Sequence, residues 1–254
     1  MKNLRLLALA AMMSLCAGLS AQTKVIAHRG YWTAEGSAQN SIAALKDAHK
    51  IGVYGSEFDV HITKDGVVVV NHDDDINKVK IEDANYAQIK DMKLKNGETL
   101  PTLEQYLAEG KKLAGTQMIL EIKAHATPEK EDRCIAATID LVRKFNMEKQ
   151  VEYISFSLHA CEQIVKANPK AVVYYLMGDL NPDEIKAKGF AGMDYYGVIF
   201  MHHPDWIEKC RKLGLKTNVW TIDNLDEIKK FADMKVDFIT TNKPVEALKI
   251  VSGK

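Results

Sequence analysis

Short apolar runs alternate with longer amphipathic runs along most of this chain of 254 residues. Apolar runs bounded by turn residues are typical of buried strands, and apolar positions that recur every three to four residues are typical of helices. Strands are predicted at residues 24–28, 53–61, 117–123, 151–156, 171–176, 196–200, 216–220 and 236–240. Helices are predicted between them, including 40–51, 100–107, 133–145 and 205–213. Eight strands joined by helical crossovers predict an α/β fold, a single-domain (β/α)8 TIM barrel.

The predicted strand at 53–61 carries acids where a buried strand normally holds apolar side chains. Glu57 and Asp59 are two residues apart, so their side chains point to the same face. Residues 64–66 then predict a tight turn and 67–70 a second short strand, after which His72 follows. Two carboxylates in an apolar segment repel each other unless a cation neutralises them. The pattern therefore predicts a metal site.

The predicted strand at 117–123 repeats this pattern, because Glu121 and Lys123 share one face of an otherwise apolar segment. An ion pair on an exposed edge is the alternative, but the apolar residues between them favour a strand whose other face is covered. Glu57, Asp59 and Glu121 offer only oxygen ligands, which suit calcium or magnesium and disfavour zinc. We therefore expect one divalent cation at these three residues, with calcium preferred over magnesium.

Further polar residues lie at the ends of predicted strands, where barrel enzymes carry their active sites. His28 and Arg29 end the first strand, and Trp220 ends the seventh. Histidine titrates near neutrality, so His28 and His72 are candidate catalytic residues. Arg29 and Lys123 are candidate substrate-binding residues, since their cations can hold anionic oxygens, and Trp220 is a candidate wall of the substrate pocket. A doubly wound open sheet is the rival fold, but it would gather ligands at one switch point rather than around the chain.

Several short motifs occur in a fixed order along the chain. They are HRG at 28–30, E-x-D at 57–59, TKDG at 63–66, HD at 72–73, PTL at 101–103, EIK at 121–123 and VWT at 219–221. In this order and spacing they resemble the glycerophosphodiester phosphodiesterase family over nearly the whole chain after residue 22. The resemblance implies that Glu57, Asp59 and Glu121 bind the metal and that His28 and His72 transfer protons.

One motif of that family is only partly matched. Its P-E-N-T-like string corresponds to AQNS at 38–41, so Gln39 stands where the family has an acid. From this motif we carry over only Asn40, as a substrate-binding residue. Its place at the start of a predicted helix also suits a helix cap.

The resemblance implies a metal-dependent enzyme that splits a small-molecule glycerophosphodiester into glycerol 3-phosphate and an alcohol. It also implies acid/base catalysis by the two histidines, with the substrate's own 2-hydroxyl as the nucleophile. We favour His28 as the base and His72 as the acid, and the reverse order stays open.

Two alternatives to this function stay open. One is a lipid-directed phosphodiesterase of the phospholipase D or sphingomyelinase D kind within the same fold. It needs an apolar docking surface, and the predicted loops show no exposed aromatic cluster. The other is a non-catalytic protein that binds phosphodiesters, which the presence of both histidines and all three acids disfavours.

The start of the chain has the layout of a secretory signal peptide. Two basic residues precede an apolar run at 6–15, and small residues near Ala21 suit cleavage there. Cleavage leaves one domain at 22–254. The apolar run is too short for a stable membrane span, and Cys16 makes a lipoprotein the alternative. We expect an exported protein, periplasmic or secreted.

Charge and cysteine content add two further expectations. Lys plus Arg and Asp plus Glu each number 34, and loss of Lys2 and Arg5 with the leader leaves 32 minus 34, or −2. This balance disfavours a nucleic-acid or anionic membrane surface. The remaining cysteines, Cys134, Cys161 and Cys210, are odd in number and lie in amphipathic segments, so we expect small buried hydrophobic side chains.

Overall fold

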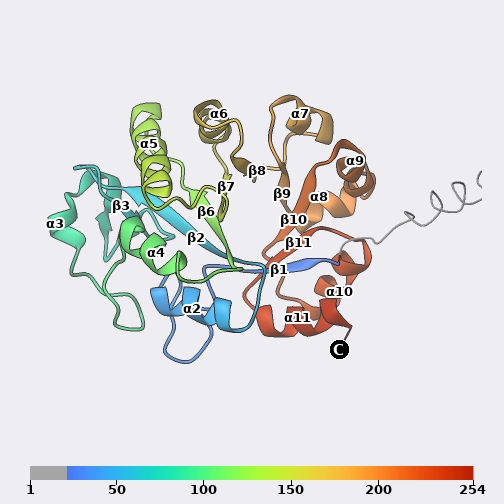
Figure 1. The fold of residues 1–254 in the computed structure, drawn as a ribbon, viewed down its shortest axis with the longest axis horizontal. Coiled ribbons are helices and arrows are strands. Elements are labelled where there is room, and N and C mark those ends of the chain that lie inside the picture. Colours follow the sequence, from blue (N-terminus) through green and yellow to red (C-terminus); the bar gives the residue numbers. More distant parts are fainter. Residues whose placement is uncertain (1–21, 254) are drawn as a thin grey trace, which may run out of the picture.

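The computed structural model describes residues 22–253, which form a closed barrel of parallel strands. The strands are β1 (Lys24–Ala27), β2 (Gly55–Ile62), β6 (Gln117–Ile122), β7 (Val151–Ser155), β8 (Val172–Tyr175), β9 (Gly192–Tyr196), β10 (Lys216–Trp220) and β11 (Phe238–Thr241). They follow one another in chain order, and β1 pairs with both β2 and β11, which closes the sheet. Figure 1 shows the strands surrounded by a ring of helices. The predicted (β/α)8 TIM barrel is confirmed.

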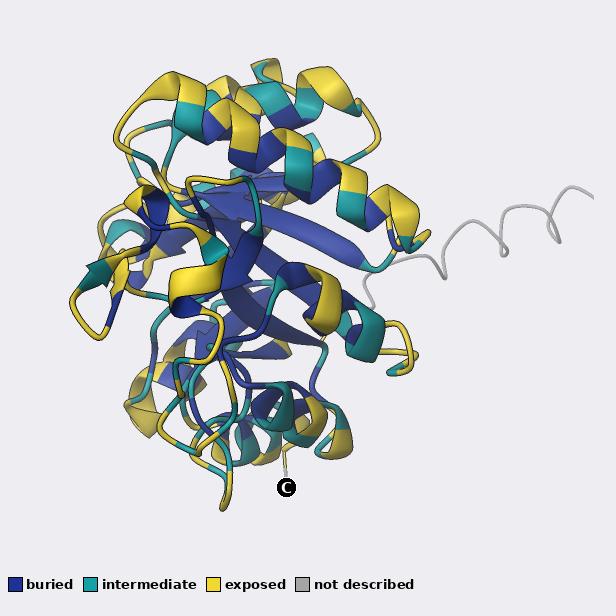
Figure 2. Cartoon of the chain, turned by 90° about the vertical axis from the view of Figure 1, so that its left-hand side faces the viewer, coloured by how far each residue is buried: buried dark blue, intermediate teal, exposed yellow. Residues whose placement is uncertain are grey.

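Helices connect the strands and cover the outside of the barrel. They are α2 (Ile42–Lys50), α4 (Leu103–Gly110), α5 (Pro128–Lys144), α6 (Leu158–Ala167), α7 (Pro182–Ala187), α8 (Gly197–His202), α9 (Asp205–Leu213), α10 (Leu225–Asp233) and α11 (Pro244–Ser252). Figure 2 shows buried residues along the strands and exposed residues on the outer sides of the helices. This is the distribution that amphipathic helices packed on a buried sheet produce.

An excursion between β2 and β6 adds small elements at one end of the barrel. They are β3 (Val68–Val70), which is antiparallel to β2, the ribbon of β4 (Asp75–Ile76) and β5 (Val79–Lys80), the 3₁₀ helix η1 (Ile81–Asp83) and α3 (Tyr86–Ile89). His72 follows β3, so this excursion carries one of the two predicted catalytic histidines to the barrel.

The two faces of the barrel strands belong to different apolar clusters. The smaller cluster draws its buried residues from strands or their ends: Ile26, Ile119, Ile154, Tyr174, Leu176 and Phe238. The larger cluster contains the alternate strand residues together with helix residues, so it lies between barrel and helices. Because Glu121 lies two residues after Ile119, it shares the inner face. The acids of β2 and β6 are thus directed into the barrel.

One predicted strand is wrong. Residues 196–200 were expected to be a strand, but β9 ends at Tyr196 and Gly197–His202 forms α8. The apolar residues at 198–200 form one turn of a short helix, and a run of that length carries no period that separates helix from strand. The true strand begins at Gly192, four residues earlier.

Two predicted helix starts are also corrected. Asn40 does not cap α2, because Ser41 takes that role and its side chain accepts a hydrogen bond from the backbone of Ala44. The predicted helix at 100–107 begins only at Leu103, where Thr102 caps α4. In both cases a residue with a hydroxyl side chain caps the helix, one position after the predicted start for α2 and two positions after it for α4.

Cys134, Cys161 and Cys210 are buried, as predicted, and all three are unpaired. None of the helices within residues 22–253 is both long and apolar enough to pass through a bilayer. The predicted signal peptide at 1–21, including Cys16, lies outside the described residues.

Candidate active site

The turn after β1 brings His28 and Arg29 to the mouth of the barrel. Arg29 has a φ of 56° and Gly30 a φ of 76°, so the chain turns back in the left-handed region. A Cβ at Gly30 would lie 2.7 Å from the Cβ of Ala44, so only glycine fits against α2 here. The backbone N–H of Arg29 donates to Oε2 of Glu57 at 2.7 Å. The turn therefore also orients a predicted metal ligand.

Glu57 and Asp59 on β2 lie beside Glu121 on β6. Each offers one oxygen, and these oxygens all lie within 4.8 Å of one another. All three side chains are buried, and Oε1 of Glu57 has no hydrogen-bond partner among residues 22–253. A buried carboxylate oxygen without a donor, in a set of ligands made only of oxygen, fits a hard divalent cation. The three residues thus form a candidate metal site.

Burial and mutual repulsion disturb the protonation of these acids. Burial, together with the charges of Asp59 and Glu121, raises the pKa of Glu57 well above its ordinary value. Burial and the charge of Asp59 also raise the pKa of Glu121 to about 7. Burial acts to raise the pKa of Asp59 as well, but Lys123 and His72 outweigh it and lower this pKa. A divalent cation bound between the three carboxylates would offset their mutual repulsion and favour their ionised forms.

Two cationic side chains border the acids. Nζ of Lys123 lies 3.2 Å from Oδ1 of Asp59 and 2.9 Å from Oε1 of Glu121. Burial alone would lower the pKa of Lys123, but these two acids raise it, so the ammonium group stays charged. Nη1 of Arg29 donates to Oε1 of Gln39 at 2.9 Å. The glutamine that replaces the family's acid therefore holds the guanidinium at the pocket.

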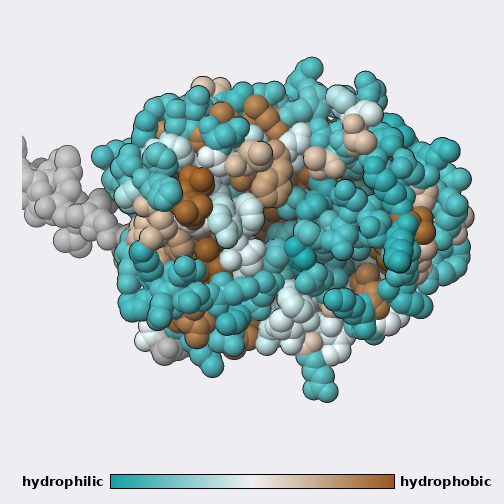
Figure 3. All heavy atoms as spheres, turned by 180° about the vertical axis from the view of Figure 1, so that it is seen from behind, coloured by the Kyte–Doolittle hydropathy of each residue, from teal (hydrophilic) through white to brown (hydrophobic). Residues whose placement is uncertain are grey.

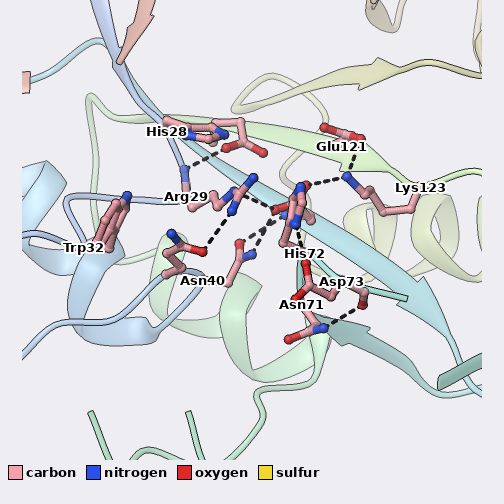
Figure 4. A network of polar contacts seen from close by, with 12 residues as sticks. His28, Arg29, Trp32, Asn40, Asn71, His72, Asp73, Glu121 and Lys123 are labelled. Atoms are coloured by element: carbon pink, nitrogen blue, oxygen red, sulfur yellow. Dashed lines mark hydrogen bonds and ion pairs between the residues drawn. The ribbon is translucent and has the colours of Figure 1, made fainter. Parts of the chain in front are cut away.

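The two predicted catalytic histidines are each held through Nδ1. That atom of His28 lies 2.9 Å from Oδ1 of Asn242, and that atom of His72 lies 2.7 Å from Oδ1 of Asp73. Nε2 of each ring is left for the substrate. Burial and the charge of Arg29 lower the pKa of His28 to about 4. Figure 4 shows both rings gathered around the space that Glu121 and Lys123 border.

One pocket of about 190 Å³ is lined by His28, Arg29, Glu57, His72, Glu121 and Lys123, together with Trp220. Phe156 stands edge-on to Trp220 at 5.4 Å between ring centres and also lines it. Asn40 is hydrogen-bonded to Asp59 at both ends of its amide. Its Nδ2 donates to Oδ2 of Asp59 at 2.9 Å, and its Oδ1 accepts from the backbone N–H of Asp59 at 3.2 Å. Both ends of its amide thus orient Asp59. His61 lines a separate cavity beyond the pocket.

Asp194 on β9 is a pocket residue that the sequence analysis missed. Its carboxylate is buried, and its Oδ1 has no hydrogen-bond partner in the described part of the chain. Burial raises the pKa of Asp194 to about 7, against a hydrogen bond from Asn218. The sequence does indicate this residue, since an acid inside the apolar string GMDYY repeats the pattern of Glu57 and Asp59. Asp194 was missed because the predicted strand began four residues too late, at 196 instead of 192.

Comparison with known proteins identifies the family. The model of the glycerophosphoryl diester phosphodiesterase family matches residues 28–246. The chain belongs to this family. A glycerophosphodiester phosphodiesterase of Caldanaerobacter subterraneus subsp. tengcongensis is 30% identical over 251 residues, which cover 91% of this chain and 98% of that protein. The resemblance predicted from the motifs is confirmed.

Solved structures of the family agree with this assignment. A glycerophosphodiester phosphodiesterase from Parabacteroides distasonis is 48% identical, with a TM-score of 0.90 over 91% of this chain and 98% of that one. A phosphodiesterase from Oleispira antarctica, solved in complex with the product sn-glycerol-3-phosphate, has a TM-score of 0.78 over 92% of this chain and 98% of that one, at 21% identity. The latter likeness shows the shared barrel fold.

Proposed function

We propose that this chain is an exported glycerophosphodiester phosphodiesterase that hydrolyses its substrate to glycerol 3-phosphate and an alcohol. The observation that carries the proposal is a pocket lined by two histidines held through Nδ1, by two cations and by Glu57 and Glu121 of the acid cluster. Family membership supports the same reaction. A non-catalytic binding protein would need neither a neutral histidine nor a second histidine paired with a carboxylate.

His28 has the properties of the base. Its low pKa keeps the imidazole neutral at physiological pH, and Nδ1–H donates to Asn242, which leaves the lone pair on Nε2. Nε2 then takes the proton from the attacking hydroxyl group, which is the substrate's own glycerol 2-hydroxyl. The oxygen attacks phosphorus and forms a cyclic phosphate, which water later opens.

His72 has the properties of the acid. The Asp73 carboxylate, 2.7 Å from Nδ1, is a counter-ion for the imidazolium form. Nε2 gives its proton to the oxygen of the departing alcohol as the P–O bond breaks. His72 also lines a second pocket of about 430 Å³, whose walls include the polar residues Asn71, Asp73 and Lys95. We place the departing headgroup there, next to the residue that protonates it.

Arg29 and Lys123 bind the phosphate oxygens, because both cations face the pocket and a guanidinium can grip two oxygens at once. Glu57, Asp59 and Glu121 hold the divalent cation, for which calcium suits the flexible all-oxygen set best and magnesium is second. When bound, the cation supplies fixed positive charge beside the phosphoryl group. Trp220 forms one wall for the glycerol, and Asn40 keeps Asp59 in place.

The test is a substrate panel with purified protein and added calcium or magnesium. Glycerophosphocholine, -ethanolamine, -inositol and -glycerol are each incubated with enzyme, and glycerol 3-phosphate is measured. Release from at least one of them, faster with calcium, is the expected result. If none releases glycerol 3-phosphate with either metal, the proposed reaction is wrong.

Export is tested separately on the protein isolated from its cells. Cleavage after Ala21 gives a soluble extracytoplasmic protein whose first residue is Gln22. Lipoprotein processing would instead give a membrane-bound protein that begins at a lipid-modified Cys16. N-terminal sequencing and mass spectrometry of cell fractions separate these outcomes.

A further inference from the structure

The second pocket, in which we place the departing headgroup, is bordered by a residue that departs from the family pattern. Gln39 lines this headgroup pocket and stands where the family has an acid. Its Oε1 accepts a hydrogen bond from Nη1 of Arg29 at 2.9 Å, and its Nε2 donates none within residues 22–253. Because a guanidinium only donates, it is the amide oxygen that must face Arg29. Position 39 therefore has free N–H donors, where a carboxylate would offer only acceptors.

The charges around the headgroup pocket do not cancel. Its titratable side chains are Lys93, Lys95, His72, Asp73 and Asp75. With His72 in the imidazolium form that a proton donor requires, three positive charges face two negative ones, which leaves +1. An acid at position 39 would bring this sum to zero. Gln39 therefore decides whether the pocket is neutral or positive.

The negative charges of the pocket already have partners, and the lysines do not. Oδ1 of Asp73 lies 2.7 Å from Nδ1 of His72, and Oδ1 of Asp75 accepts from the backbone N–H of Lys78 at 3.0 Å. Neither Lys93 nor Lys95 has a carboxylate oxygen within 4.0 Å of Nζ in the described part of the chain. Both lysines are exposed, so their ammonium groups are left for a ligand.

The surroundings of the headgroup pocket are polar as well. Its walls come from the segment between β1 and α2 and from the excursion between β2 and β6. Seen from behind, mostly hydrophilic residues cover the side of the molecule that carries this excursion, and hydrophobic residues gather on the side of α8 and α9 (Figure 3). A pocket of about 430 Å³ is large enough for a headgroup with charged substituents.

We propose that this pocket selects acidic headgroups, so that the preferred substrates are glycerophosphodiesters whose leaving alcohol carries a carboxylate or a second phosphate. This rests on the proposed phosphodiesterase function and names the substrate class of that site. Lys93 and Lys95 bind the acidic group, and Nε2 of Gln39 donates a hydrogen bond to it. The P–O bond to the headgroup breaks and water adds across it. The products are glycerol 3-phosphate and an alcohol that keeps its acidic group.

A cationic headgroup fits this pocket less well. Its ammonium group would either take Asp73 from His72, for which this carboxylate is the counter-ion, or bind at Asp75 alone. In both places Lys93 and Lys95 border the same pocket and repel it. Specificity of this kind comes as much from repulsion of the wrong charge as from attraction of the right one.

Matched pairs of substrates test the charge of the headgroup. Glycerophosphoserine differs from glycerophosphoethanolamine only by a carboxylate. Glycerophosphoglycerol with a phosphate on its terminal hydroxyl differs from glycerophosphoglycerol only by that phosphate. In each pair we expect kcat/KM, measured with saturating metal, to be roughly tenfold higher for the acidic member at low ionic strength, and about twofold higher near 0.5 M salt, because salt screens exposed lysines.

The outcome that overturns the proposal is a pair without this advantage. If either pair shows equal or lower kcat/KM for its acidic member at low ionic strength, while its members are hydrolysed, the pocket does not select negative charge. A lack of glycerol 3-phosphate from every substrate would instead contradict the phosphodiesterase function itself.

Gln39→Glu places the family's acid in the pocket without changing the size of the side chain. The new carboxylate also pairs with Arg29 and weakens phosphate binding for every substrate. The readout is therefore the ratio of kcat/KM within each pair, in which the shared phosphodiester cancels. We expect this ratio to fall from roughly tenfold to below about twofold. An unchanged ratio would show that Gln39 does not set the preference.

Gln105→Glu is the matched control, because it makes the same change of charge at an exposed residue that lines a different cavity. Its carboxylate can still accept from the backbone N–H of Thr102 in the cap of α4, so the fold is retained. Thermal unfolding checks this for both variants. The ratio within each pair should stay at the wild-type value.

Lys93→Gln and Lys95→Gln remove the other proposed contacts. Each should lower the ratio within both pairs roughly threefold. Lys78→Gln, at the turn between β4 and β5 and outside the pocket walls, is their control and should leave the ratio unchanged. If Gln39→Glu lowers the ratio and neither lysine variant does, the effect passes through Arg29 alone. The headgroup pocket would then not be where the acidic group binds, and the proposal would be wrong.

Discussion

Asn242 determines which nitrogen of His28 can act as a base. Its Oδ1 accepts hydrogen bonds from the His28 ring and from Nε1 of Trp32 at 2.8 Å. Its Nδ2 donates to Oδ2 of Asp223 at 2.8 Å, which fixes the orientation of the amide. Because Oδ1 can only accept, the His28 proton lies on Nδ1 and the lone pair on Nε2. Asn242, which lies 214 positions away in the sequence, thus sets the tautomer of the histidine in the HRG motif.

The first prediction removes this hydrogen bond. Asn242→Leu keeps the size of the side chain but no longer orients the His28 ring, so we expect kcat to fall roughly ten- to a hundredfold. KM should change little, because the phosphate-binding cations are untouched. Steady-state kinetics on glycerophosphocholine with saturating calcium measure this. Thr33→Ala, which removes only a marginal 3.5 Å contact to the Asn242 backbone, is the control and should retain wild-type kcat.

The second prediction concerns pH. A base must be neutral to act, and burial lowers the pKa of His28 from 6.5 to about 4. Activity that depends on neutral His28 is therefore lost only as pH falls through about 4, and an ordinary histidine would lose it near 6.5. We expect kcat/KM, measured with saturating metal at each pH, to keep most of its value at about pH 5.5. Asp194 lines the same pocket with a pKa of about 7, so the profile is measured for Asp194→Asn as well. An acidic limb centred near 6.5 in both proteins would contradict the role given to His28.

At the scale of elements, the sequence predicts most residues of the active site but misses Asp194, the helix α8 and Asn242. The period of two places Glu57 and Asp59 on one face, and this needs no knowledge of the partner strand. Asp194 and α8 were missed because a short apolar run such as GVIF at 197–200 has no period that separates helix from strand. Asn242 was missed because a polar residue after a strand is ordinarily a loop residue. Its role appears only when β11 closes the barrel against β1.

The third prediction tests the pairing of β9 with β10, which positions Asp194 beside Asn218. A Cβ at Gly192 would lie 2.0 Å from the backbone oxygen of Lys216, so Gly192→Ala must push two paired strands apart. We expect a loss of about 3 kcal/mol in the free energy of unfolding. Denaturation in urea measures it.

Gly197→Ala is the matched control for that change. Its Cβ would meet only the ends of the Ile222 and Phe231 side chains, at 2.9 Å, and these can move. The loss should therefore be nearer 1 kcal/mol. Equal losses for both glycines would show that the strand contact is not the constraint.

At the scale of the whole molecule, closure of the barrel gathers residues that are far apart in the chain. His28 follows β1, His72 follows β3, Glu121 lies on β6 and Trp220 on β10. Parallel strands present their C-terminal ends on one side of the barrel, so His28, Glu121 and Trp220 meet around one pocket. The antiparallel strand β3 runs back along β2 and brings His72 to the same pocket. The cost of this arrangement is a set of buried acids that repel one another. Metal binding should therefore stabilise the entire fold and not only the site.

The last prediction measures that stabilisation. Calcium or magnesium at about a hundred times its dissociation constant adds about 2.7 kcal/mol, which for a chain of this size raises Tm by roughly 5–10 °C. Glu57→Gln should abolish activity and most of this rise. It should not destabilise the metal-free protein, because Glu57 is the acid whose pKa is raised most clearly by burial and repulsion. The amide oxygen can still accept from the Arg29 backbone.

His72→Ala separates the metal site from the proton donor. It should abolish activity and keep the full rise in Tm, because His72 supplies a proton and no metal ligand. Differential scanning fluorimetry across a metal titration measures both variants beside the wild type. A Glu57→Gln protein that still gained stability with the logarithm of calcium concentration would place the cation elsewhere. In that case the unpartnered Oε1 of Glu57 would require another explanation, such as protonation of the carboxyl group, which its raised pKa favours.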